Sequence, residues 1–304
     1  MTQHPGPSFA TRLLRLGGFA VATSAAGLTF AMFTLSERAA RSIVFPPHAV
    51  DDRTPASIGL TYQEVAFPSG DGTALRGWLI PGGPAAVVVA HGHGGSKGQV
   101  LDYARFLRER GGYTVLLFDF RASGQSDGEK VTLGFYERQD VLGALDFLSR
   151  QSGLDSHRIG GLGLSMGAAA LLLLGPDAQR LRGIVADSSF TDGQSLVSHF
   201  DRWFHLPSWP FSVTVPWAIE RFAGLAPRDV APVKTAASIA PTPLFIIHGS
   251  DDQGIPATDA VAIHAAAGEP KQLWIVPGAE HGAALAVAGE EYKQRVLAFF
   301  RSTL

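Results

Sequence analysis

The sequence contains no cysteine and few charged residues. Without cysteine the chain has no disulfide scaffold, thiolate metal site or cysteine nucleophile. Charged residues make up 17% of the 304 residues, against an average of about 25%, and 25 basic residues nearly balance 27 acidic ones. That balance leaves no basic surface for nucleic acid. Because 46% of the residues are hydrophobic, the chain is not disordered, and it can form one large or two average domains.

Part of the charge deficit lies near the N-terminus. Residues 16–35 include no charged side chain, and arginines flank this run on both sides. As a helix the run would span about 30 Å, the thickness of the hydrocarbon core of a bilayer. We expect a single-pass membrane anchor here, within an N-terminal tail of residues 1–50. The alternatives are a cleaved signal peptide, which would leave a secreted protein, and a buried helix. The flanking arginines leave the side of the membrane open.

The remainder, residues 51–304, alternates short apolar runs with longer helical patterns. The first two runs flank a Ser-Gly-Asp-Gly turn and predict a hairpin, whereas the later runs are continuously apolar, as in a sheet buried on both faces. We therefore predict an α/β fold with a mostly parallel central sheet and helices on both faces. Strands are expected at residues 62–67, 75–80, 86–91, 113–118, 158–164, 183–186, 244–248 and 272–276. Helices are expected near residues 99–110, 135–151, 167–174, 257–267 and 288–301.

One stretch interrupts this alternation. Residues 190–235 have no strand pattern and are rich in tryptophan, phenylalanine and proline. A segment this long between strands indicates a lid or binding insertion, and we predict a small helical cap. Trp203, Trp209 and Phe211 are the candidate substrate-binding residues. The alternative is that these aromatic side chains form the core of the cap itself.

The motif G-x-S-x-G occurs three times, centred on Ser96, Ser126 and Ser165. In a nucleophile elbow the serine occupies a sharp turn between a strand and a helix. Ser165 directly follows an apolar strand pattern and precedes a run of alanines and leucines. Ser126 is followed by a polar loop, and Ser96 lies in a glycine-rich loop. Context therefore favours Ser165 as the nucleophile.

A serine hydroxyl needs a base, and the base needs an orienting acid. His281 follows the last predicted strand and is the candidate base. Asp252 follows the preceding strand and is the candidate acid, with Asp187 as the alternative, although most carboxylates after strands only satisfy their own loops. The pair His91-Gly92-His93 has no third metal ligand nearby, so we expect neither a metal nor another cofactor.

From about residue 60 to the end, the chain resembles the α/β-hydrolase fold family. The order Ser165, Asp252, His281 matches the order in that family. Residues 119–126 resemble its D-x-R-x-x-G-x-S loop, and residues 248–256 its H-G-x-x-D-x-x-V-P block, with Ile255 in place of valine. The compact cap and the N-terminal run resemble the branch of esterases and serine aminopeptidases. The loop His-Gly-His-Gly-Gly differs from the His-Gly-Gly-Gly of esterases similar to hormone-sensitive lipase.

The resemblance implies a serine hydrolase with no cofactor. Ser165 would attack a carbonyl, His281 would take its proton, and the backbone N–H groups of His93 and Met166 would form the oxyanion hole. We expect hydrolysis of apolar carboxylic esters of modest size through an acyl-serine intermediate. The alternatives are an aminopeptidase or amidase acting on peptides, and a non-enzymatic, membrane-tethered binding protein. The expected partners are a small ester and a membrane, through residues 16–35, and not nucleic acid.

Overall fold

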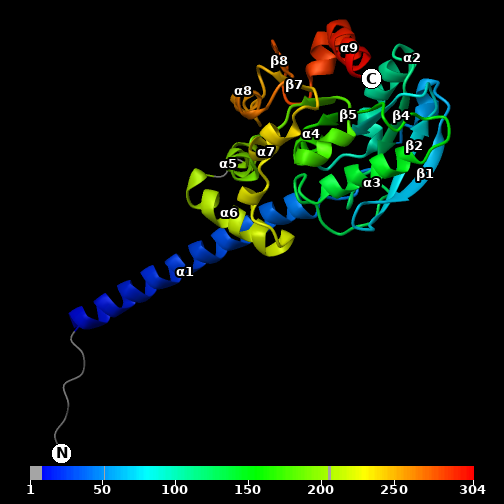
Figure 1. The fold of residues 1–304 in the computed structure, drawn as a ribbon. Helices are drawn as coiled ribbons and strands as arrows, with labels where there is room; N and C mark the ends of the chain where they lie inside the picture. Colours follow the sequence, from blue (N-terminus) through cyan, green and yellow to red (C-terminus); the bar gives the residue numbers. More distant parts are fainter. Residues whose placement is uncertain (1–8, 51, 205–206) are drawn as a thin grey trace, which may run out of the picture.

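The computed structural model describes residues 9–50, 52–204 and 207–304, except for the side chains of residues 10–23, 25 and 199–204. Figure 1 shows a body built around one sheet, from which a long N-terminal helix projects. The sheet has eight strands in the order β1-β2-β4-β3-β5-β6-β7-β8. The strands are β1 (Gln63–Pro68), β2 (Ala74–Ile80), β3 (Ala86–Ala90), β4 (Thr114–Phe118), β5 (Ile159–Leu164), β6 (Ile184–Asp187), β7 (Leu244–Gly249) and β8 (Lys271–Val276).

Strand β2 pairs antiparallel with both β1 and β4, and all other neighbouring strands are parallel. The parallel part is buried on both faces, because successive residues of β3 enter different hydrophobic clusters. Val88 belongs to one cluster, and Val87 and Val89 belong to the other. These features confirm the predicted α/β-hydrolase fold.

Helices cover both faces of the sheet. Helices α3, α4 and α8 contribute to the cluster that contains Val88, and α2 and α9 contribute to the opposite cluster. The helices of the body are α2 (Leu101–Glu109), α3 (Glu137–Ser149), α4 (Met166–Leu172), α7 (Pro232–Thr235), α8 (Ala257–Ala266) and α9 (Ala284–Thr303). Short 3-10 helices are at Pro55–Ile58, Lys97–Val100, Gly175–Arg180, Pro227–Asp229 and Ala236–Ile239.

The segment between β6 and β7 carries the helices α5 (Gly193–Phe204) and α6 (Ser208–Ala223). The N-terminal helix α1 (Phe9–Val44) packs its last turns against α6, beside the body (Figure 1). Ala39, Ala40, Ile43 and Val44 are buried there in a third hydrophobic cluster, together with side chains of α5 and α6. The C-terminal end of α1 is thus packed into the same unit as the cap.

Within the described part of the chain, no helix is long and apolar enough to cross a membrane. The run predicted to be an anchor, residues 16–35, falls partly outside that description, because the side chains of residues 16–23 and 25 are not described.

Candidate active site

The loops that follow β3, β5, β7 and β8 meet at the carboxyl edge of the sheet, where ligands bind in open α/β sheets. Ser165 occupies the turn between β5 and α4, with a φ of 54°. A positive φ is strained for a residue other than glycine. The turn is also tight, because a Cβ added at Gly167 would meet the carbonyl oxygen of Ala90 at 2.3 Å. The small flanking residue therefore allows α4 to begin against β3.

His281 lies between Ser165 and Asp252. Its Nδ1 is 2.6 Å from Asp252 Oδ2, and its Nε2 is 2.9 Å from Ser165 Oγ. Because an ionised carboxylate only accepts hydrogen bonds, Nδ1 carries the proton, and Nε2 accepts from the serine hydroxyl. The structure thus brings together the three side chains that the sequence singled out.

The carboxylate of Asp252 is fully satisfied. Its Oδ1 accepts from the backbone N–H groups of Gly254 and Ile255, at 2.9 and 2.8 Å, and its Oδ2 also lies 3.2 Å from His248 Nε2. Burial alone would raise the pKa of Asp252, but hydrogen bonds from His248 and His281 outweigh it and hold the pKa below its ordinary value. Asp252 is therefore ionised at neutral pH and fixes the orientation of the His281 ring.

The loop after β3 is held from two directions. The Gly92 N–H donates to Gln99 Oε1 at 3.1 Å, and His93 Nε2 donates to the carbonyl of Ile43 at 2.7 Å. Burial lowers the pKa of the His93 ring, so it is neutral. His91 Nε2 accepts from the Phe120 N–H at 3.0 Å. The two histidines of the H-x-H pair thus bind backbone groups, and the last turn of α1 holds one of them.

The serine of the second G-x-S-x-G match has a structural role. Ser126 is buried. Its Oγ donates to the Asp119 carbonyl at 2.6 Å and accepts from the Arg76 N–H at 2.9 Å. The Asp119 carboxylate in turn accepts from the backbone N–H groups of Lys97 and Gln125, at 2.7 and 2.9 Å. This loop therefore braces the segment that follows the glycine-rich loop.

A cavity of about 200 Å³ opens beside Ser165. Its walls are mainly apolar, and it adjoins a wider groove of about 640 Å³ between α2 and α9, with which it shares Gln99, Leu164 and Gly282. The cavity is lined by Gly92, His93, Gln99, Leu133, Leu164, Ser165, Met166, Phe190, Leu196, Ile255, His281 and Gly282.

The aromatic residues predicted as substrate contacts are placed differently. Trp209 is 80% exposed, and Phe211 is buried in the cluster that joins α6 to α1, so neither lines the cavity. The side chain of Trp203 lies outside the described residues. The reason is that α6 turns its inner face toward α1 rather than toward Ser165. Sequence reasoning did not identify Leu196 and Ile255 as cavity-lining residues, although Ile255 lies only three positions after Asp252.

Residues 99–304 match the model of the prolyl oligopeptidase family. The chain belongs to this family. It is a serine hydrolase of the prolyl oligopeptidase family, and the match covers the elbow as well as the loops of Asp252 and His281. The match begins at Gln99, after the loop that contains His93.

Among the relatives of this family member are two bacterial proteins. It is 28% identical over 252 residues to the uncharacterised protein YfhR of Escherichia coli K12, covering 80% of this chain and 81% of YfhR. It is 30% identical over 255 residues to the uncharacterised protein Rv2307c of Mycobacterium tuberculosis, covering 82% of each chain.

Two solved structures extend the likeness. The Pyrococcus furiosus esterase Pf2001 is 29% identical, with a TM-score of 0.73, over 86% of this chain and 98% of the esterase. The acylaminoacyl peptidase of Pyrococcus horikoshii, 19% identical with a TM-score of 0.60, matches 81% of this chain and 42% of the peptidase. The second likeness concerns the fold alone.

Proposed function

We propose that this serine hydrolase cleaves carboxylic esters with small apolar acyl groups, through an acyl intermediate on Ser165. The hydrogen-bonded chain from Ser165 through His281 to Asp252, beside an apolar cavity of about 200 Å³, carries the proposal. His281 Nε2 takes the proton of the serine hydroxyl as Oγ attacks, and later returns a proton to the leaving alcohol. Asp252 stabilises the imidazolium that forms.

Two backbone donors are suited to the oxyanion. Met166 is the first residue of α4, so its N–H has no acceptor within the helix. The Gly92 N–H already donates to Gln99, which leaves His93 as the next donor along the loop. We assign the oxyanion hole to the N–H groups of Met166 and His93, where the loss of one donor typically costs about 10²- to 10³-fold in kcat.

An ester is favoured over a peptide for two reasons. The similar Pf2001 protein of P. furiosus is described as an esterase. In addition, an amide requires protonation of its leaving amine. A peptidase also requires a site that binds the terminus of its substrate, and the cap sequence offers no acidic cluster for such a site. Peptide hydrolysis is the second candidate, because the family is named for an oligopeptidase.

Substrate panels distinguish the two candidates. We expect hydrolysis of short-chain p-nitrophenyl esters and little cleavage of aminoacyl p-nitroanilides; the reverse preference would establish the peptidase. Ser165→Ala should lower kcat on the order of 10⁴-fold or more, while the matched control Ser96→Ala keeps its activity. A fluorophosphonate probe should label Ser165, and a non-enzymatic binding protein would remain unlabelled.

We also propose that residues 16–35 anchor the chain in a membrane as a single span. The support is the absence of charge over a length that fits a hydrocarbon core. After expression of the full chain, the protein should remain in the membrane fraction through an alkaline wash, with its N-terminal residues intact by mass spectrometry. A shortened chain released from the membrane would instead establish a cleaved signal and a secreted protein.

A further inference from the structure

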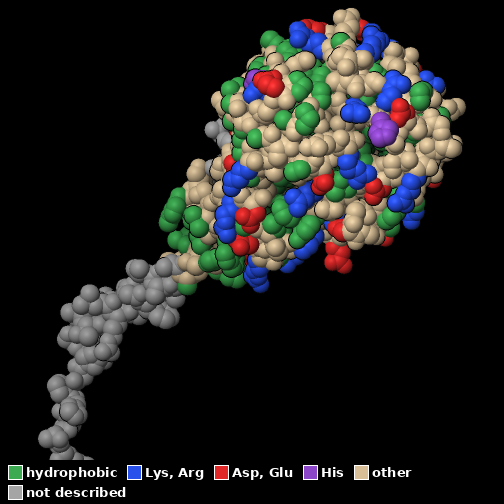
Figure 2. Space-filling model, in the orientation of Figure 1, with side chains coloured by type: hydrophobic (Ala, Val, Ile, Leu, Met, Phe, Trp, Pro, Cys, Tyr) green, Lys and Arg blue, Asp and Glu red, His purple; other side chains and the backbone are tan. Residues whose placement is uncertain are grey.

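Helices α1 and α6 present large apolar side chains to the outside where they pack together. Trp209 is 80% exposed and Phe30 is 75% exposed, and the rings of Phe33 and Trp217 meet edge to face with centroids 5.8 Å apart. Figure 2 shows hydrophobic side chains gathered where the helix leaves the body. The α1–α6 face comprises Leu28, Phe30, Phe33 and Leu35 of α1, with Trp209, Val213 and Trp217 of α6.

The two helices become charged at the same level. Residues 26–36 of α1 and residues 208–219 of α6 carry no charge. The first charged residue of α1 after this run, Glu37, forms an ion pair with Arg221 of α6, at 2.9 Å. Arg38 and Arg41 follow on α1, both exposed. A single boundary between uncharged and charged surface thus crosses both helices, although their sequences lie far apart in the chain.

Three hydroxyl side chains below this boundary, those of Thr34, Ser36 and Thr214, are hydrogen-bonded within the two helices. Thr34 Oγ1 donates to the Phe30 carbonyl at 2.9 Å, and Ser36 Oγ lies 2.7 Å from Thr214 Oγ1 across the interface between the helices. Hydrogen bonds of this kind are needed where no water is available, and interhelical contacts between small hydroxyl residues are typical of membrane helices.

We propose that the α1–α6 face inserts into a phospholipid bilayer, so that the cap helix α6 lies in the membrane beside α1. Tryptophan side chains concentrate at the bilayer interface, and arginines mark its polar side, as Trp217 and Arg221 do here. The α1 side chains of this face lie within residues 16–35, the uncharged run proposed as the anchor, so the bilayer that holds the anchor is also what covers the face. Lipid acyl chains then cover apolar surface that would otherwise face water.

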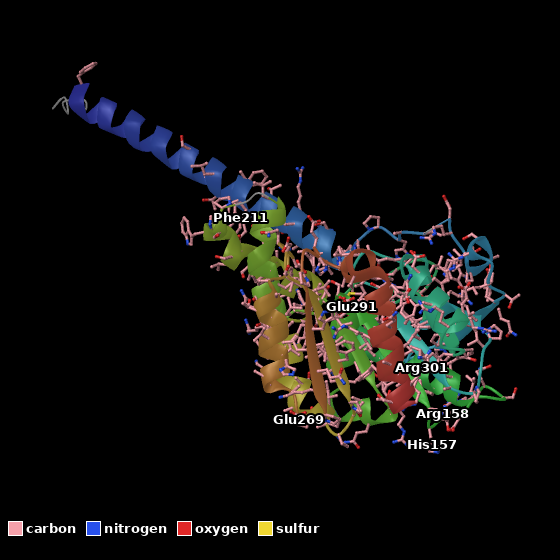
Figure 3. All side chains as sticks on the ribbon, turned by 90° about the horizontal axis from the view of Figure 1, so that it is seen from above. His157, Arg158, Phe211, Glu269, Glu291 and Arg301 are labelled. Carbon is pink, nitrogen blue, oxygen red and sulfur yellow. The ribbon has the colours of Figure 1, made fainter. Side chains whose placement is uncertain are left out.

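The insertion places the route to the active site next to the lipid. Phe190, Leu196 and Ile255 line the cavity and belong to the same hydrophobic cluster as residues of α1 and α6. Figure 3 labels Phe211 where α6 lies against α1, while Glu269, Arg158 and His157 lie at the opposite end of the body. An apolar ester dissolved in the bilayer therefore reaches the cap directly from the lipid. This consequence rests on the proposed esterase function, whereas the membrane contact does not.

The absence of cysteine makes a direct test possible in the full chain. Val213→Cys, 64% exposed on α6, and the control Val261→Cys, 50% exposed on α8, each carry one polarity-sensitive fluorophore. In vesicles of phosphatidylcholine and phosphatidylglycerol, the label at residue 213 should shift to shorter wavelength and be quenched by doxyl-labelled lipid, whereas the label at 261 should do neither. A shift at residue 213 without quenching would indicate a protein partner, and no shift would indicate water; either result overturns the proposal. Combining Ser165→Ala with Val213→Cys should leave the quenching intact, which separates this test from the hydrolase chemistry.

The consequence for substrate access has its own test. Val213→Glu places a charge on the α1–α6 face and should lower the hydrolysis of a vesicle-borne ester, made of a short acyl group and a long-chain alcohol, by roughly tenfold. Hydrolysis of p-nitrophenyl acetate in water should not change, which also shows that the variant folds. The matched Val261→Glu should leave both activities as they are. Equal activity of the two variants on the vesicle-borne ester would overturn this route.

Discussion

Asp187 is the last residue of β6 and Asp252 follows the neighbouring parallel strand β7, and their carboxylates differ in the direction in which the pKa moves. Asp252 accepts from His281, His248 and two backbone N–H groups, and its pKa lies below the ordinary range. Asp187 accepts from Tyr292 and Ser188, at 2.8 and 2.9 Å, and burial outweighs these bonds to raise its pKa. The donors around a buried carboxylate therefore decide whether it is kept ionised.

Their places relative to His281 differ as well. Asp252 contacts the ring of His281 directly. Asp187 does not contact that ring: it accepts from Ser188 Oγ, which in turn accepts from the N–H of Gly282, the residue after His281, at 3.2 Å. The Asp252 carboxylate thus orients the base His281 directly, and the Asp187 carboxylate supports the backbone that follows it.

The largest expected effect is on catalysis. Asp252→Asn should lower kcat/KM for p-nitrophenyl acetate about 10⁴-fold, because asparagine cannot hold His281 in the tautomer that accepts from Ser165. Asp187→Asn keeps an oxygen acceptor for Tyr292 and should lower kcat/KM by less than about tenfold, because Asp187 does not contact His281 itself. Equal losses in the two variants would mean that the two carboxylates share the role of the acid.

A smaller effect is expected on stability. Tyr292→Phe removes a donor from the fully buried Asp187 and should lower the free energy of unfolding by about 1–3 kcal/mol, with kcat/KM nearly unchanged. Urea unfolding of Tyr292→Phe, Asp187→Asn and the double variant measures the coupling between the two groups. Additive losses would contradict the importance of this hydrogen bond.

The smallest effect is the opposite pH dependence of the two sites. The lowered pKa of Asp252 contributes stability that is present above pH ~4 and lost as the pH falls below it. The raised pKa of Asp187 means that the folded state retains a proton above pH ~4, so its contribution declines as the pH rises.

Urea unfolding at pH 3 and pH 7 tests these signs. Asp252→Asn should be more destabilising at pH 7 than at pH 3, and Asp187→Asn should be less destabilising at pH 7 than at pH 3. The two differences in the free energy of unfolding should therefore have opposite signs. The same trend in both variants would contradict the opposite directions in which the two pKa values move.

Much of the fold could be predicted from local patterns. The continuous apolar runs at β3 and β5 predicted buried parallel strands, and the Ser-Gly-Asp-Gly turn predicted the hairpin of β1 and β2. The insertion of β4 between β2 and β3 could not be read from the runs, because strand order depends on pairing between distant segments. The roles expected of Trp209 and Phe211 depended on which way α6 faces, and its packing against α1 decides that.

The sequence by itself determined the chemistry that is available. Residue types and short spacings identified Ser165 between a strand and a helix, and His281 after the last strand. The absence of cysteine excluded a thiol nucleophile. Each of these features can be read from a short stretch of sequence or from composition. Only the tertiary structure decided that Asp252 rather than Asp187 reaches His281, and that Ile43 of α1 holds His93. Both contacts join segments far apart in the chain, so they depend on how the loops and helices pack at the sheet edge.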